Sequence, residues 1–525
     1  MRPLAPRILL FGGSDRATAA VAARLSERAA TTGLEVVEIP PGAPPPAGAI
    51  AACVYLASSR SGRPLVPDRA DAESVLASIA QHDVDRAILV SHAAVFPASH
   101  RHPGLVGEGR RPVRARRHAI ASAWLALERT FAARFGRELL VLRVPPSELS
   151  RRPGGWVPTW GGWTLVLPGR DPTIQVLDPE DLARAVAAAV VVETEERVLH
   201  LAPRAPAPLR RALRAAHARL LAVPAWLQRL VGAAGRDELD FGRYSWTLAG
   251  ERGAQRLGVA PLRTTLEAVA GAAAAPPVAD RPVEWFGLDR DWIARRGWLF
   301  RFLYRRYWRI RAEGLENVPP EGAAMLVGTH RGFMPWDAIM ALWGMDSRRG
   351  RVPRFLVHPG LLLPPFVSTF ITRLGGVPAN RDNAERLLQG GELVGVFPEG
   401  VHGAFRRYRD RRQVGRFPSL EFLRVASRRQ VPVVPFVTVG SAESMPVFAQ
   451  IGWRWWRRLS EWPCLPVALP WPLPLRWRAR YLPARRITGG DEAAIRQAAE
   501  ALRLELQATM DALYAARRRD SREPS

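Results

Sequence analysis

Residues 323–343 read AAMLVGTHRGFMPWDAIMALW. The run before Gly328 has the composition of a buried strand, and the apolar residues from Ala338 to Trp343 predict a helix after the turn. A strand that passes through a glycine- and proline-containing turn into a helix is the repeating unit of a parallel sheet. The stretch therefore predicts an α/β fold, and it places two titratable residues inside the turn.

These two residues are His330 and Asp337, seven positions apart. A histidine at the end of a strand and an aspartate at the start of a helix can lie close in space, and the helix dipole favours the aspartate there. Such an aspartate fixes the histidine tautomer and stabilises the imidazolium, so that the other ring nitrogen serves as a general base. The alternative is that Asp337 only caps the helix and His330 is an incidental surface residue.

Three later segments place further polar residues at the ends of apolar runs. Residues 374–381 (LGGVPANR) put an arginine after a tight turn, where it suits a phosphate. Residues 393–400 (LVGVFPEG) predict a buried strand that ends in a carboxylate and a glycine. Residues 431–436 (VPVVPF) predict another buried strand, with a proline near its end.

The four blocks, His–Asp, Gly-Gly-x-x-x-x-Arg, Phe-Pro-Glu-Gly and Val-Pro-Val-Val-Pro, resemble in order and spacing those of the glycerolipid acyltransferase family. That family includes the lysophosphatidic acid acyltransferases, and the resemblance runs from before Gly314 to near Ile487 and the closing helix. It implies transfer of a fatty acyl group from acyl-CoA or acyl carrier protein to the hydroxyl of a lysophospholipid or related glycerolipid. No cofactor is required beyond the acyl co-substrate.

Carried over block by block, the resemblance implies that His330 is the base that deprotonates the acceptor and that Asp337 is its partner. Arg381 would bind the phosphate or headgroup of the acceptor, Glu399 would position the acceptor or complete the pocket, and Pro435 would shape the acyl-donor channel. Arg406 suits a phosphate or CoA, and a solvated charge run remains the alternative. The substrate-binding residues expected on these grounds are Arg381, Phe397, Pro398, Glu399, Gly400, Arg406 and Pro435.

One departure concerns the spacing of the first block. The usual family pattern places the Asp five residues after the His, whereas Asp337 follows His330 by seven. The longer Gly…Pro-Trp-Asp form resembles a subgroup with less typical acceptors, including diacylglycerol-like ones. The acceptor thus stays open between lysophosphatidate, diacylglycerol and a long-chain alcohol.

The N-terminal half alternates predicted strands and helices. Strands separated by helices pair in parallel, so residues 1–272 predict a doubly wound Rossmann-like sheet, followed by a linker at 273–282 and the acyltransferase-like domain at 283–525. After the first strand, Gly12 and Gly13 give a weak dinucleotide signal, because Asp15 and Thr18 stand where the later glycines of the fingerprint should be. The strands are expected at 7–11, 34–39, 49–56, 87–90 and 138–144, and the helices at 17–30, 70–81 and 115–135.

This half resembles the extended short-chain dehydrogenase/reductase superfamily in four segments: 54–57 (VYLA), 87–96 (AILVSHAAVF), 142–145 (LRVP) and 176–182 (VLDPEDL). The family's redox chemistry needs a Ser/Thr and a Tyr-x-x-x-Lys pair. The chain contains no lysine, so that pair cannot exist, and His92 and His118 stand near the positions of the Ser and Tyr. The resemblance implies the fold with degenerate chemistry, and a bifunctional protein that still binds NAD(P) in a redox or regulatory role is the alternative.

The composition of the 525-residue chain limits the partners. With 75 basic residues, all arginine, against 49 acidic ones, the net charge of +26 attracts polyanions. Two cysteines exclude a disulfide scaffold and a Cys-rich zinc site, and the histidines lack metal-ligand spacing, so we expect no metal. No apolar run reaches the ~18–20 residues of a membrane-spanning helix.

Arginines interleaved with aromatic residues favour a membrane surface as the partner. At 289–311, Trp292, Phe300 and Tyr307 recur at roughly helical spacing beside an arginine face, which is typical of an interfacial helix on anionic lipid. Residues 453–458 and 462–477 form a second aromatic region. The alternative is a core helix with a solvated arginine face. No nucleic-acid motif accompanies these residues, so we expect a cytoplasmic protein, peripheral on the inner face of the membrane; a non-enzymatic lipid-binding protein is a third possibility.

Overall fold

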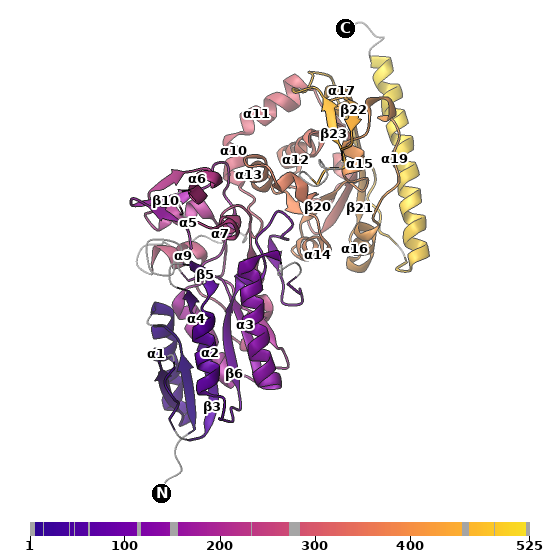
Figure 1. Cartoon of the computed structure of the whole chain (residues 1–525). Coiled ribbons are helices and arrows are strands. Elements are labelled where there is room, and N and C mark those ends of the chain that lie inside the picture. The colour runs from indigo at the N-terminus through magenta and orange to yellow at the C-terminus, as the bar shows by residue number, and fades with distance from the viewer. Residues whose placement is uncertain are drawn as a thin grey trace. The chain divides into compact units, whose positions relative to one another are not determined.

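The computed structural model describes residues 6–520 apart from 14, 41, 47, 61–62, 113–116, 148–155, 231, 233, 272–283, 454–460 and 488. The chain forms two compact units, Met1–Gly287 and Leu288–Ser525, coloured from indigo to yellow along the sequence (Figure 1). The predicted linker at 273–282 lies outside the described residues.

The N-terminal unit is built on a six-stranded, fully parallel sheet in the order β2-β1-β3-β6-β8-β12. Numbered by position along the chain, this is the order 2-1-3-4-5-6 of a doubly wound sheet, whose switch point lies beside β1. The predicted α/β fold is confirmed here. The strands are β1 (Arg7–Phe11), β2 (Glu35–Ile39), β3 (Ile50–Leu56), β6 (Ala87–His92), β8 (Leu139–Val144) and β12 (Val198–His200).

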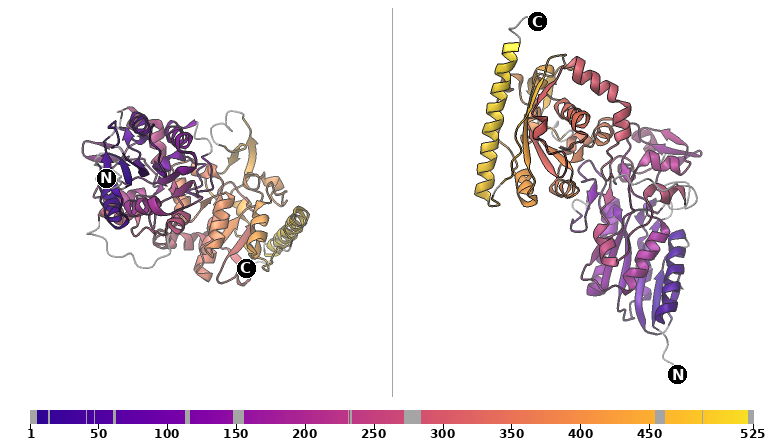
Figure 2. Two further views of the ribbon diagram at one scale, coloured as in Figure 1. Left: turned by 90° about the horizontal axis from the view of Figure 1, so that it is seen from below. Right: turned by 180° about the vertical axis from the view of Figure 1, so that it is seen from behind.

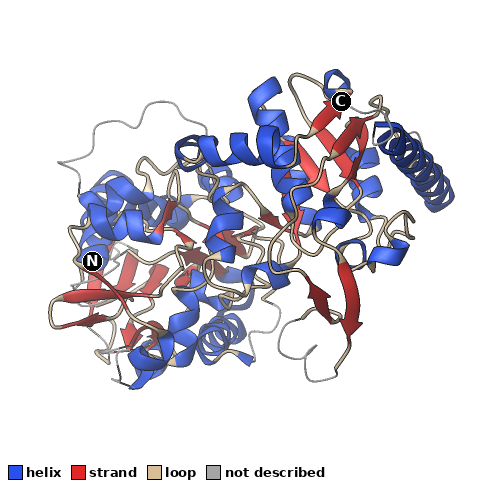
Figure 3. Cartoon of the chain, turned by 90° about the horizontal axis from the view of Figure 1, so that it is seen from above, coloured by secondary structure: helices blue, strands red, loops and turns tan. Residues whose placement is uncertain are grey.

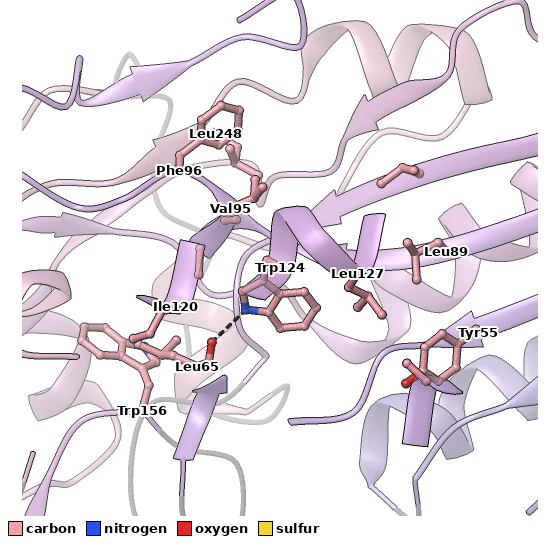
Figure 4. Close-up of a cluster of buried hydrophobic side chains, with 14 of the residues drawn as sticks. Tyr55, Leu65, Leu89, Val95, Phe96, Ile120, Trp124, Leu127, Trp156 and Leu248 are labelled. Atoms are coloured by element: carbon pink, nitrogen blue, oxygen red, sulfur yellow. Dashed lines mark hydrogen bonds between the residues drawn. The ribbon is translucent and has the colours of Figure 1, made fainter. Parts of the chain in front are cut away.

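Helices cover both faces of this sheet, because both faces of its strands are apolar. Ile8 and Leu10 of β1 face a core formed with α1 (Arg16–Thr32) and α4 (Pro179–Val191). Leu9 and Phe11 face the opposite core, formed with α2 (Arg69–Ser78) and α3 (Ala119–Phe135). In that second core the Trp124 indole donates a hydrogen bond of 2.7 Å to the Leu65 carbonyl (Figure 4).

Short elements complete the N-terminal unit. Small sheets pair β14-β10-β9, β11-β13, β15-β7 and β4-β5. Their strands are β4 (Ser59–Arg60), β5 (Arg63–Pro67), β7 (Leu105–Val106), β9 (Thr159–Trp160), β10 (Trp163–Val166), β11 (Thr173–Ile174), β13 (Ala207–Pro208), β14 (Leu220–Ala222) and β15 (Thr247–Leu248). The helices are α5 (Leu209–Ala215), α6 (Ala225–Leu230), α7 (Arg236–Phe241), α8 (Glu251–Leu257) and α9 (Thr265–Ala270).

The C-terminal unit has a seven-stranded sheet in the order β16-β24-β21-β17-β20-β18-β19, parallel except where β21 meets β24. The predicted second α/β domain is confirmed, and in Figure 3 its strands (red) lie between helices (blue). The strands are β16 (Arg311–Glu313), β17 (Ala324–Gly328), β18 (Arg354–Val357), β19 (Val377–Pro378), β20 (Leu393–Val396), β21 (Val433–Val439) and β24 (Arg478–Tyr481).

The closing helix α19 (Glu492–Asp520) lies along one side of the C-terminal unit and buries an apolar stripe that includes Leu502, Leu506 and Leu513 (Figure 2). Among the described residues, no helix has both the length and the hydropathy that crossing a bilayer would take. The other helices are α10 (Arg290–Arg295), α11 (Gly297–Phe302), α12 (Trp336–Arg349), α13 (Val367–Arg373), α14 (Arg381–Gln389), α15 (Val401–Ala404), α16 (Glu421–Arg429) and α17 (Ser441–Ser444), beside a hairpin of β22 (Val447–Ile451) and β23 (Leu465–Ala468).

The prediction of one amphipathic helix over residues 289–311 is wrong. Helix α10 ends at Arg295, Arg296 forms a turn, α11 starts at Gly297, and a π-helical turn over Leu303–Tyr307 precedes β16. Trp292 and Phe300 of the expected aromatic face are buried in the core, as in the alternative of a core helix, whereas Trp298 and Phe302, which lie outside that face, are exposed. Of the second aromatic region, residues 454–458 lie outside the described part of the chain.

Candidate active site

His330 and Asp337 meet at the carboxyl edge of the C-terminal sheet. His330 follows the end of β17, and Asp337 is the second residue of α12. The Nδ1 atom of His330 lies 2.8 Å from Oδ2 of Asp337, and the two side chains are 13% and 0% exposed. The predicted proximity is confirmed despite the seven-residue spacing, because each residue is positioned by a separate element of the sheet and its helices.

Backbone groups hold the Asp337 carboxylate in place. Oδ2 also accepts a hydrogen bond of 2.9 Å from the Arg331 amide, and Oδ1 accepts one of 2.8 Å from the Ala338 amide. The position in the first turn of α12 favours the negative charge. A carboxylate that only accepts directs the proton of the imidazole to Nδ1, so Nε2 of His330 is the nitrogen that remains to take a proton.

Phe397 packs on the base. It follows the end of β20, and its ring stacks on the His330 imidazole at 4.8 Å between centroids. Phe355 stacks on Phe397 in turn, at 5.3 Å. The sequence led us to expect Phe397 among the substrate-binding residues, and the structure adds that its ring fixes the plane of the imidazole. Pro398, which follows it, is buried.

Glu399 is the centre of a buried charge network. Its carboxylate accepts hydrogen bonds from Arg331 Nη1 (2.5 Å), Arg406 Nη2 (2.8 Å) and the Gly415 amide (2.7 Å). These bonds occupy both carboxylate oxygens. Glu399 and Arg406 thus link the loop after β17, the loop after β20 and the segment at Gly415. A phosphate or CoA would have to compete with Glu399 for Arg406.

Arg331 is a functional candidate that the sequence reasoning missed. Its buried guanidinium bonds Glu399 and also donates to the carbonyls of His330 (2.7 Å), Arg411 (3.1 Å) and Gln413 (2.8 Å). A charged residue carries no hydrophobic periodicity, so the pattern analysis could not single it out. The available signal was Glu399, since a carboxylate expected at the end of a buried strand needs a cationic partner.

Two glycines near His330 have different roles, a turn at Gly400 and a close approach at Gly403. Gly400 adopts φ 57° and ψ −143°, a backbone conformation open to glycine, where the chain turns from Glu399 into α15. At Gly403 a Cβ atom would lie 3.0 Å from the His330 carbonyl oxygen and 3.0 Å from Glu399 Cβ. The sequence pointed to Gly400 but not to Gly403, which lets α15 pack directly against the loop that carries the base.

The structure does not bring the other predicted residues against the dyad. Arg381 is the first residue of α14, is exposed, and pairs with Glu385 at 2.9 Å. It follows β19, three strand positions from β17, or ~14 Å at the usual strand spacing. Pro435 is buried in β21 beside Val327 of β17, and it is the third residue of a strand that extends to Val439.

The first turn of the N-terminal unit does not fit the pyrophosphate of a dinucleotide. Asp15 caps α1, and its carboxylate accepts a hydrogen bond of 2.7 Å from the Thr18 amide. The helix N-terminus that would receive the phosphates is therefore covered by a negative charge. Thr18 is buried against Gly12, where a Cβ would lie 2.8 Å from the threonine methyl group. The space beside Gly12, which the fingerprint keeps open for the pyrophosphate, is thus filled by Thr18.

His92 and His118, which the sequence resemblance set near the dehydrogenase catalytic positions, pack within the core. His92 Nδ1 accepts a hydrogen bond from the Ala94 amide, its ring stacks on Trp124, and burial lowers its pKa to about 3. His118 caps α3, and burial lowers its pKa as well. Beside them, Arg143 binds the Glu128 carboxylate through two hydrogen bonds of 2.9 and 2.8 Å.

Residues 309–439, which contain the dyad and the Glu399 network, match the family model described as Acyltransferase. The C-terminal unit carries an acyltransferase domain. The acyltransferase match ends at the last residue of β21, so it takes in every predicted block.

Curated relatives match part of the chain. Uncharacterized proteins of Mycobacterium tuberculosis and Mycobacterium leprae are each 31% identical, over 42% and 41% of this chain. The matches span 64% and 61% of those relatives' own lengths. The chloroplastic phytyl ester synthase 2 of Arabidopsis thaliana is 32% identical over 133 residues, which are 24% of this chain and 19% of that protein.

Solved structures of epimerases are neighbours of the N-terminal half. A UDP-glucuronic acid 4-epimerase from Bacillus cereus aligns with 12% identity and a TM-score of 0.36, over 50% of this chain and 96% of the epimerase. A UDP-galactose 4-epimerase aligns with 16% identity and the same TM-score and coverage. The assignment of a doubly wound fold to this half rests on the strand order of its own sheet.

Proposed function

We propose that the chain transfers a fatty acyl group from the thioester of acyl-CoA or acyl carrier protein to the hydroxyl of a lysophospholipid or related glycerolipid. The observation that carries the proposal is the 2.8 Å contact between His330 Nδ1 and Asp337 Oδ2 within the acyltransferase domain. A histidine at the carboxyl end of a strand, paired with a buried carboxylate, can act as the general base that deprotonates an alcohol.

In the proposed reaction, Nε2 of His330 takes the proton of the acceptor hydroxyl as its oxygen attacks the thioester carbonyl. Asp337 stabilises the imidazolium that forms. The carbon–sulfur bond then breaks, and the thiolate leaves with the proton that His330 had taken. A positioned base of this kind contributes ~10²–10⁴-fold to the rate, and alignment of the two substrates contributes further.

Three classes of acceptor fit the proposal. Arg381, the residue expected to bind a phosphate headgroup, lies on the rim and is paired with Glu385. A relative named for the synthesis of phytyl esters supports retaining a long-chain alcohol beside lysophosphatidate and diacylglycerol as acceptors. The acceptor hydroxyl is common to all three, so the role of His330 is the same in each.

The test incubates the full chain with labelled acyl-CoA, or with labelled acyl carrier protein, and a panel of lysophospholipids, monoacylglycerol, diacylglycerol and long-chain alcohols. We expect an ester product whose formation falls by ~10²–10⁴-fold in His330→Ala. His402→Ala is the matched control, because His402 is exposed and stands just beyond the Phe-Pro-Glu-Gly block. Transfer that survives in His330→Ala, or no product with either donor, would contradict the proposal.

A further inference from the structure

The C-terminal unit exposes large apolar side chains at two places that the sequence keeps far apart. On α11, Trp298 and Phe302 lie one turn apart and are 71% and 48% exposed. In the loop before β24, Trp471 is 79% exposed and Leu473 is also exposed. Side chains of this size are normally covered when they occur together.

Hydrogen bonds join these two segments. The Tyr307 hydroxyl donates to the Pro472 carbonyl at 2.6 Å, and the Trp308 indole donates to the Leu473 carbonyl at 3.2 Å. Phe302 contacts the Tyr307 ring at 6.1 Å between centroids. The segment that contains α11 and the loop before β24 are therefore neighbours in space, and so are the exposed side chains they carry. We call these side chains the apolar rim, which consists of Trp298, Leu299, Phe302, Trp471 and Leu473.

The apolar rim lies at the same end of the unit as the dyad. Trp308, which anchors the loop, contacts Trp336 at 5.4 Å, and Trp336 is the residue before Asp337. In Figure 1, α11 and the β22–β23 hairpin lie at the same end of this unit as α15 and α17. Helices α15 and α17 follow the carboxyl ends of β20 and β21, which is the edge that carries His330.

The two segments that carry the apolar rim contain charged residues of one sign. Between Asp291 and Glu313 the chain has seven arginines and no acidic residue. Arg301, Arg305 and Arg306 are exposed on α11 and the turn after it. From Trp462 to Gly490 the chain also lacks acidic residues. Exposed tryptophan beside arginine matches the headgroup layer of an anionic bilayer, which takes indoles at its interface and attracts cations.

We propose that the apolar rim is a docking surface for an anionic lipid bilayer. Trp298, Phe302 and Trp471 insert at the level of the headgroups, and the neighbouring arginines contact lipid phosphates. Docking in this way presents the carboxyl edge of the sheet, with His330, to the lipid surface. The proposal stands apart from acyl transfer, because binding to vesicles needs no turnover.

The test measures co-sedimentation of the full chain with vesicles of equal parts phosphatidylcholine and phosphatidylglycerol. We expect binding that weakens in high salt and is much weaker on phosphatidylcholine alone. Trp298→Ala/Phe302→Ala should lower the affinity about tenfold or more. Arg301→Gln/Arg305→Gln should lower it roughly fivefold per arginine. His330→Ala should bind as wild type does, which separates failure of docking from failure of catalysis.

The control is Trp226→Ala/Leu230→Ala on α6, because these side chains are also apolar, exposed and four residues apart. The control should bind vesicles like the wild type. Equal loss in both double variants, unchanged binding in Trp298→Ala/Phe302→Ala, or equal binding to neutral vesicles would overturn the proposal. A lipid-free dimer that Trp298→Ala/Phe302→Ala converts to a monomer would assign the apolar rim to a second copy of the chain and would overturn it as well.

Discussion

Each of the two units places a histidine at the carboxyl end of a parallel strand, and only one of them has the arrangement of a base. His92 ends β6, accepts a hydrogen bond from Ala94 and stacks on Trp124 within the core. His330 follows β17, faces the Asp337 carboxylate and keeps part of its ring exposed. Both histidines lie at the carboxyl edge of a parallel sheet, so position alone does not make a site. A carboxylate partner and a partly exposed ring distinguish His330 from His92.

A second pair of features makes the comparison sharper. Each unit buries an arginine–glutamate pair next to its histidine: Arg143 with Glu128, and Arg331 with Glu399. In the N-terminal unit, Glu128 also accepts a hydrogen bond from the Ser91 hydroxyl. These bonds join Glu128 to Arg143 and Ser91 and not to His92. In the C-terminal unit the arginine also bonds the His330 carbonyl, which couples the pair to the proposed base.

The largest effect is expected from Asp337→Asn. The amide is nearly isosteric but uncharged, and it has one acceptor oxygen where Asp337 uses two. It therefore cannot stabilise the imidazolium, and its NH2 group would face an N–H donor, so transfer should fall by about 10²–10⁴-fold. The rate of acyl transfer from the donor that proves active measures this. Asp346→Asn, the same change on the same helix beyond the site, should leave the rate within twofold, about the noise of such assays. Equal rates in the two variants would remove Asp337 from the mechanism.

The two buried pairs should respond differently to loss of the arginine. Arg143→Met leaves Glu128 with the Ser91 hydroxyl alone and should destabilise the N-terminal unit by about 3–5 kcal/mol, while acyl transfer by the folded protein is unchanged. Arg331→Met leaves Glu399 with Arg406 and the Gly415 amide, so it should cost less stability. It should lower the transfer rate, because the His330 loop loses its anchor.

Urea unfolding curves and transfer rates, measured on the same preparations, test this contrast. If Arg143→Met impairs transfer in the fully folded protein, or if Arg331→Met lowers stability without changing the rate, the separation between the two pairs is wrong.

The smallest expected effect is on the free energy of unfolding of the N-terminal unit, which should depend on pH. Burial lowers the pKa of His92 and of His102 to about 3, whereas the unfolded value is 6.5. The unfolded chain therefore binds more protons between these values, and the stability is complete above pH 6.5 and decreases as the pH falls. Between pH 6.5 and pH 5 each histidine should cost roughly 1.5 kcal/mol.

Urea midpoints at pH 7 and pH 5 measure the effect. His92→Asn/His102→Asn is the control, because each imidazole accepts a hydrogen bond from the amide two residues on, which an asparagine oxygen can also accept. The double variant should lose most of the acid sensitivity of this unit. An unchanged pH profile would assign the sensitivity to other groups.

Much of this fold could be predicted because strands buried on both faces are continuous apolar runs. The first strand was expected at 7–11 and is β1 (Arg7–Phe11); Glu35–Ile39 and Leu139–Val144 start one residue later than expected. The contact between His330 and Asp337 was also expected, since a strand end and the following helix start share one edge of the sheet.

The rest depends on contacts that sequence patterns do not encode. The spacing of the aromatic residues at 289–311 predicts a shared face but not what covers it: Trp292 packs on Phe370 and Phe300 on Trp343, so this face lies in the core. Arg331 and Gly403 matter because of what lies beside them in space, namely Glu399 and the His330 carbonyl. Neither contact follows from hydrophobic periodicity.

The loop between the two dyad residues has a consequence for how such domains are found and altered. His330 is fixed by the end of β17 and Asp337 by the start of α12, so their contact does not depend on one particular number of residues between them. A search that demands one fixed interval between the two residues would overlook chains like this one. The interval is itself held by packing, because Gly332 adopts φ 90° beside the Ser441 carbonyl and Phe333 packs on Phe405 and Trp462, so an exchange of this loop has to keep a glycine and an aromatic residue at these positions.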